Sequence, residues 1–187
     1  GDLRAYAPTL ANGGAYGWKD EPRIWRIVAM PRDCDTTRAT ECTRLLADFD
    51  KVWRLMTKDA DRVHVLWAGA MPPGVAVPEE VRQVRADDGL RAGLARWNEA
   101  GGDAAWLVDP NGFVVLRYAP GFDPGDLRTD LARLMENMGQ SARAASALMG
   151  KAAPAPKNTA LREAARLMRS QSAALHIENE KDQSAAR

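Results

Sequence analysis

The stretch AWLVDPNGFVVLRY, residues 105–118, holds two apolar runs separated by Asp109-Pro110-Asn111-Gly112. Asp, Pro, Asn and Gly are the residues that tight turns prefer, and the flanking runs are rich in β-branched and aromatic side chains. The stretch predicts an antiparallel hairpin of strands 104–108 and 113–118. Asp109 is interpreted as a turn residue rather than a catalytic acid.

The segments before and after this hairpin predict a mixed sheet flanked by helices. Strands are indicated at 24–30 (IWRIVAM, ended by Pro31), at 63–67 and, shorter, at 81–85. Apolar residues recur every three or four positions from Thr36 to Met56, which predicts a helix, and Asp87 or Asp88 can cap another. A helix between the early strands implies parallel pairing, and a last amphipathic helix covers 124–138. The expected fold class is α/β, a thioredoxin-like mixed β-sheet.

The two ends of the chain have a different composition. Residues 1–23 are rich in Gly, Ala and Tyr and predict an irregular lead-in, the end of a linker to a membrane tether. The domain is expected at 24–140. Residues 141–187 are expected to form a linker, KAAPAPKN at 151–158, and an amphipathic helix capped by Thr159 before a polar end. Because the chain starts at Gly1, we expect that a segment lies upstream.

Charge and hydropathy exclude some classes of function. The chain has 26 basic and 25 acidic side chains, so no global field indicates a nucleic-acid partner. No run approaches the roughly 20 apolar residues of a membrane helix. The arginine-bearing helix after Thr159 fits an acidic partner or an anionic membrane surface, and a solvated or disordered tail is the alternative.

WRIVAMPRDCD, followed about 70 residues later by AWLVDPNGFVVLRY, resembles the Sco/SenC family over about residues 18–138. These are thioredoxin-fold proteins of cytochrome c oxidase assembly, and the closer likeness is to a divergent, membrane-tethered branch. The resemblance implies partners among cytochrome c oxidase subunits or assembly factors. It also implies a location on the periplasmic side of the bacterial inner membrane.

The family's copper ligands are only partly present. The family binds copper through Cys-x-x-x-Cys and a histidine before the hairpin, a soft donor set that suits Cu(I). Cys34 matches the first ligand, but the second position falls on Arg38 and the histidine position on about Gly101. We therefore expect no copper cofactor, with Cys34 as the one weak candidate for a metal ligand.

The two cysteines are expected to remain separate thiols. A helix starting near Thr36 would hold Cys42 on its apolar stripe, on the order of 9 to 12 Å from Cys34. A disulfide requires Cα atoms within about 7 Å. Cys42 is interpreted as a small buried hydrophobe. Cys34, next to a helix N-terminus, is either a vestige or a candidate redox thiol.

The histidines and tryptophans indicate no further site. His64 lies in a strand and predicts a packed, hydrogen-bonded core histidine, whereas His176 falls in the tail. Two distant histidines do not form a zinc pattern. Trp18 and Trp25 are candidates for an interface.

Three hypotheses of function remain. The first is a non-enzymatic Sco/SenC-like protein, acting in cytochrome c oxidase assembly or as an accessory factor of the respiratory membrane, with its copper site largely lost. The second is a thiol-disulfide reductant or weak copper carrier that uses Cys34. The third is a structural accessory subunit of the oxidase.

Overall fold

The computed structural model describes residues 1–18, 24–100, 102–151 and 153–170. By its contacts the chain divides into two compact units, Gly1–Leu134 and Met135–Arg187. Among the described residues, no helix is long and apolar enough to cross a membrane.

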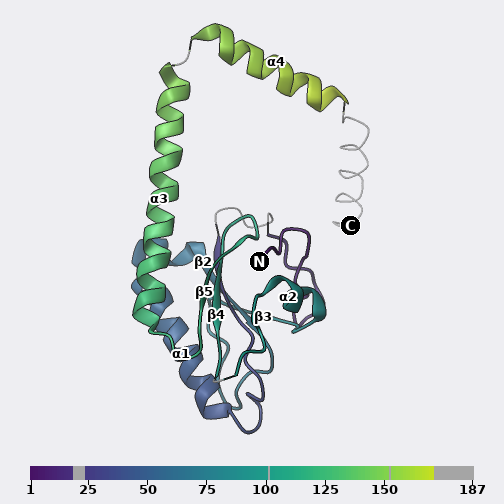
Figure 1. Cartoon of the computed structure of the whole chain (residues 1–187), viewed down its shortest axis with the longest axis vertical. Coiled ribbons are helices and arrows are strands. Elements are labelled where there is room, and N and C mark those ends of the chain that lie inside the picture. Colours follow the sequence, from purple (N-terminus) through teal and green to yellow (C-terminus); the bar gives the residue numbers. More distant parts are fainter. Residues whose placement is uncertain (19–23, 101, 152, 171–187) are drawn as a thin grey trace. The chain divides into compact units, whose positions relative to one another are not determined.

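A five-stranded mixed sheet forms the centre of the first unit, which confirms the predicted α/β thioredoxin-like fold (Figure 1). The strand order is β3-β2-β1-β4-β5. β1 pairs in parallel with β2 and β2 with β3, whereas β4 is antiparallel to both β1 and β5. The strands are β1 (Trp25–Ala29), β2 (Val63–Ala68), β3 (Val81–Val84), β4 (Ala105–Val108) and β5 (Val114–Tyr118).

Helices lie on both faces of this sheet (Figure 1). α1 and the start of α3 lie on one face, and the short α2 lies on the other. Ile27 of β1 is opposite Val65 and Leu107, and all three are fully buried. The helices are α1 (Ala39–Leu55), the 3-10 helix η1 (Thr57–Arg62), α2 (Asp88–Gly93), α3 (Pro124–Lys151) and α4 (Pro154–Ser170).

The predicted start of α2 is confirmed, whereas the predicted start of α1 is wrong; α2 itself ends at Gly93, before Leu94 and Trp97, which the sequence also placed on this helix. Asp87 caps α2, its side chain accepting a hydrogen bond from the backbone of Leu90. α1 begins at Ala39, not near Thr36, because residues 33–38 form turns in which the carbonyl of Asp33 accepts from the backbone amide of Arg38. This shift of three residues decides the geometry of the cysteines.

The tail is more helical than expected. α3 runs on to Lys151 and α4 begins at Pro154, so most of the predicted linker at 151–158 is helical. The prolines at 154 and 156 lie in the first turn, where amide hydrogens have no acceptor within the helix and proline is tolerated. Thr159 consequently lies inside α4 and donates to the carbonyl of Ala155 instead of capping. The expected polar end, with His176, lies outside the described residues.

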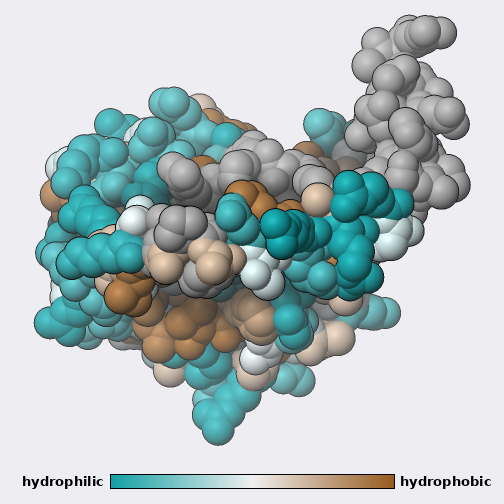
Figure 2. All heavy atoms as spheres, turned by 90° about the horizontal axis from the view of Figure 1, so that it is seen from above, coloured by the Kyte–Doolittle hydropathy of each residue, from teal (hydrophilic) through white to brown (hydrophobic). Residues whose placement is uncertain are grey.

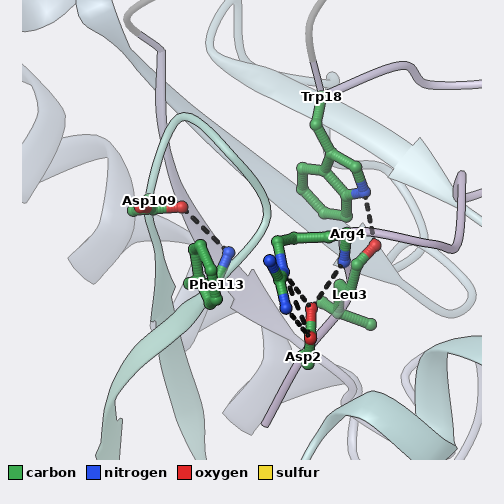
Figure 3. Close-up of polar contacts among 6 residues, drawn as sticks. All are labelled: Asp2, Leu3, Arg4, Trp18, Asp109 and Phe113. Atoms are coloured by element: carbon green, nitrogen blue, oxygen red, sulfur yellow. Dashed lines mark hydrogen bonds and ion pairs between the residues drawn. The ribbon is translucent and has the colours of Figure 1, made fainter.

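The described part of the lead-in, residues 1–18, has only isolated bridges, and it is attached to the core through the buried side chains of Leu3, Tyr16 and Trp18 while most of its other residues are exposed. Leu3 and Trp18 belong to the same core cluster as Trp106 of β4. The indole of Trp18 donates to the carbonyl of Leu3 at 2.8 Å, beside Arg4, which lies over the ring of Phe113 (Figure 3). Because Trp18 and Trp25 are 5% and 2% exposed, the interpretation of these tryptophans as interface residues is wrong.

The hairpin turn is built as the sequence predicts. One carboxylate oxygen of Asp109 accepts from the backbone amides of Asn111 and Phe113, both at 2.9 Å. Figure 3 draws the hydrogen bond from Phe113. Gly112 has φ +94°, a conformation that glycine adopts without strain. Asp109 thus holds the connection between β4 and β5.

Candidate functional site

Cys34 and Cys42 form a disulfide, so the prediction of two separate thiols is wrong. Their Cα atoms are 5.5 Å apart. The prediction failed because it placed Cys34 in line with a continuous helix. The chain instead turns at Asp33, which has φ +56°, and passes Cys34 back toward the first turn of α1.

The disulfide is buried beneath the N-terminal end of α1. Cys34 is 1% exposed and Cys42 is fully buried, which confirms the expected burial of Cys42. The two sulfur atoms lie 3.9 and 4.0 Å from the carbonyl oxygen of Arg32. A thiol or oxidant in solution therefore has little direct access to either sulfur.

A second connection, an ion pair rather than a covalent bond, lies at the same end of α1. The guanidinium of Arg38, at the helix N-cap, donates two hydrogen bonds to the carboxylate of Asp103, at 3.0 and 2.6 Å. Asp103 lies just before β4, and its side chain is 9% exposed. Hydrogen bonding to Asp103 raises the pKa of Arg38 above its ordinary value, with burial as a smaller opposing effect. The pair ties the start of α1 to the start of β4.

The residues at this end of the sheet do not fit a copper ion. The sulfur of Cys34 is committed to a disulfide, and Arg38 is a cation that offers no lone pair. Gly101, at the expected histidine position, lies outside the described residues. Within the described ranges, no group of three His, Cys, Asp or Glu side chains could hold a metal ion.

A recess of about 430 Å³ opens beside the ion pair. Charged side chains from α1 line one wall, and the loop before α3 supplies an aromatic floor. Phe122 of that loop stacks on Phe49 of α1, with ring centroids 6.3 Å apart. The recess is lined by Glu41, Arg44, Leu45, Asp48, Asp103, Gly121, Phe122 and Pro124. Its mixed charge suits a polypeptide segment better than an apolar small molecule.

His64 is a hydrogen-bonded core histidine, as predicted. Its Nδ1 is 2.9 Å from the hydroxyl of Tyr16, which accepts a hydrogen bond from Arg26. Arg26 is fully buried on β1 and also donates to the carbonyl of Trp18. These three side chains attach the lead-in to the sheet. The sequence signal for this buried cluster is Arg26, a charged residue inside the apolar run IWRIVAM.

Glu80 is a second buried ionisable group that sequence reasoning missed. It is 2% exposed, and neither carboxylate oxygen has a hydrogen-bond partner among the described residues. Burial raises the pKa of this carboxyl above its ordinary value. Nothing in its position directly before β3 distinguishes it in the sequence from Glu79.

The fold defines this chain as a thioredoxin-fold protein. Residues 25–137 match the family described as "Transmembrane-like, thioredoxin-like, C-terminal domain". This match covers more than half of the chain, so the protein belongs to that family. No curated protein matches the sequence.

Solved structures with the same fold include copper proteins and others. Copper-bound yeast Sco1 is similar with a TM-score of 0.53 and 10% identity, over 70% of this chain and 89% of Sco1. Trgpx in its apo form gives a TM-score of 0.52 and 12% identity, over 73% of this chain and 96% of Trgpx. Copper-bound ScoI of Bradyrhizobium japonicum gives 0.47 and 16%, over 68% and 95%. At these identities the likeness to yeast Sco1 and to Trgpx establishes the fold alone.

Proposed function

We propose that this protein is a non-enzymatic, Sco/SenC-like binding module that acts in cytochrome c oxidase assembly or as an accessory factor of the respiratory membrane. Its partners would be oxidase subunits or other assembly factors, on the periplasmic side of the bacterial inner membrane. The observation that carries the proposal is the Arg38–Asp103 ion pair, which stands where the resemblance places the second copper ligand.

The chemistry of this pair favours binding over metal transfer. The resemblance to the Sco/SenC family implies a copper ion that would connect the loop before α1 to the segment before β4. Here a bidentate guanidinium–carboxylate contact connects the same two segments without a metal. A fixed cation close to Cys34 would also disfavour Cu(I) electrostatically. The recess lined by α1 and Phe122 then remains as a surface for a partner polypeptide.

Competition titration tests the loss of copper binding. The full chain, first reduced so that Cys34 is a thiol, is titrated with Cu(I) against a colourimetric chelator, with yeast Sco1 as the positive control. We expect no tight equimolar site. Retention of one copper per chain that is lost in Cys34→Ser would overturn this part of the proposal.

Partner binding is tested separately from copper. Affinity-tagged full chain, crosslinked in membranes of its source, should recover oxidase subunits or assembly factors. Glu41→Lys with Asp48→Lys, in the recess, should reduce recovery, whereas Lys51→Glu with Lys58→Glu, exposed residues of α1 and η1 outside the recess lining, should not. Equal recovery of oxidase by all variants would contradict the recess as the binding surface. Recovery of no oxidase component would contradict the proposed partners.

A thiol-disulfide role is the second candidate, and the disulfide itself favours it. A cysteine pair next to a helix N-terminus in a thioredoxin fold is a suitable position for exchange. Its burial argues against rapid turnover. A phenotype lost in both Cys34→Ser and Cys42→Ser, but retained in Arg38→Gln, would favour this candidate. Copurification with the oxidase at fixed stoichiometry would instead favour a structural subunit.

A further inference from the structure

Large apolar side chains are exposed on the tail helices, defined here as residues 135–151 of α3 and Pro154–Ser170 of α4. Leu148 and Leu161 are 72% and 67% exposed. Met138, Met149 and Leu167 are further exposed apolar side chains among the described residues of these helices. Exposed leucines and methionines grouped in one segment mark a surface that another body covers.

In α4 these side chains share one face of the helix. At about 100° per residue, Leu161, Ala164, Ala165 and Leu167 fall within an arc of about 160°. Arg162, Arg166 and Arg169 fall within an adjoining arc of about 60°. α4 is therefore amphipathic, with an apolar face that arginines border on one side. Figure 2 shows apolar side chains gathered in one patch among hydrophilic ones on the face of the molecule that it draws.

The tail helices have an excess of basic over acidic side chains that is larger than that of the whole chain. The whole chain has a net charge of +1, yet six basic side chains and only two acidic ones lie between Met135 and Ser170. The basic residues are Arg143, Lys151, Lys157, Arg162, Arg166 and Arg169, and the acidic ones are Glu136 and Glu163. The surface that covers this segment must tolerate or attract a cluster of cations.

We propose that the tail helices bind the surface of an anionic lipid bilayer, with α4 lying in the plane of the headgroups. Arginines that border an apolar face can reach phosphates while their stems remain on the apolar side. A second copy of the chain fits less well, because two basic helices repel each other and alanines leave little apolar surface between them. The binding is peripheral and depends on anionic lipid, since alanines fill much of the apolar face and leave it only a small apolar area.

Vesicle cosedimentation of the full chain tests this proposal. The probes are phosphatidylcholine vesicles with or without about one quarter phosphatidylglycerol. We expect binding to the anionic vesicles only, weakened by added salt. Arg162→Glu with Arg166→Glu should lower the partition coefficient at least about tenfold. Leu161→Asp with Leu167→Asp should also lower it.

The matched control reverses two basic residues on α1 that lie outside the recess lining. Lys51 and Arg54 are exposed, and Arg54 pairs with Asp50 on its own helix as Arg166 pairs with Glu163. Lys51→Glu with Arg54→Glu changes the net charge equally and should retain binding. The proposal is overturned if both double reversals weaken binding alike, if neutral vesicles bind as well, or if no vesicle binds. Concentration-dependent dimers abolished by the leucine variant, without vesicle binding, would assign the surface to a second copy.

Discussion

Arg38 and Asp103, 65 residues apart in sequence, are joined by two parallel hydrogen bonds between the N-terminal end of α1 and the start of β4. The geometry is that of a bidentate pair, in which direction as well as charge contributes to the interaction. Asp103 is the more enclosed partner, at 9% exposure against 27% for Arg38.

Breaking this pair from its two sides should have unequal effects. Arg38→Gln leaves an enclosed carboxylate without its cation and should lower the free energy of unfolding by about 2 to 3 kcal/mol. Asp103→Asn leaves an arginine that can reach water, and should cost roughly 1 kcal/mol. Urea unfolding of both variants and the double variant measures the coupling. If the two single variants lose equal free energy of unfolding and the double variant loses their sum, the contact contributes no stability of its own.

The disulfide should contribute measurably to stability. Closing a loop of this length restricts the unfolded chain and should contribute about 2.5 kcal/mol. Cys34→Ser with Cys42→Ser is therefore expected to lower the free energy of unfolding by that amount. Alkylation of the denatured chain should add two labels only after reduction. Two labels without reduction would show that the cysteines are separate thiols and would contradict the disulfide.

Glu80 should make stability fall as the pH rises above roughly 4.3, the ordinary pKa of an unfolded glutamate. Its pKa is raised in the fold by burial, so between the two pKa values the folded chain binds more protons than the unfolded chain. Stability contributed by protonated Glu80 is therefore lost through this window. Glu80→Gln cannot ionise and should remain more stable at neutral pH, with a flatter curve. Thermal unfolding at a series of pH values from acidic to neutral measures the difference, and Glu79→Gln is the control. Parallel curves for wild type and Glu80→Gln would contradict it.

Deleting residues 151–187 should leave the thioredoxin-fold unit nearly as stable as before. The sheet is covered without the deleted helix, since Leu127 and Leu131 of α3 are fully buried and lie before the deletion. The expected change in the free energy of unfolding is within about 0.5 kcal/mol. A loss of more than about 2 kcal/mol, the scale of burying one large apolar side chain, would mean that the tail packs as part of the fold.

The strands, the hairpin and the helical face of α1 followed from local patterns in the sequence. Alternation and apolar runs set β1, β2 and β4, and Asp109 to Gly112 set the turn, because these depend on neighbours within a few residues. The extent of the tail helices was missed because prolines were interpreted as breaks, although a first turn accepts them.

The candidate site was decided only by the tertiary structure. The left-handed backbone at Asp33 brings Cys34 and Cys42 within bonding distance, and aspartate tolerates that conformation without demanding it. Asp103 reaches Arg38 because antiparallel pairing of β4 with β1 brings the start of β4 to the end of β1, near the start of α1. Local sequence fixes which residues form strands and helices. Contacts between distant residues depend on loop conformation and sheet order, for which a single sequence carries no local signal.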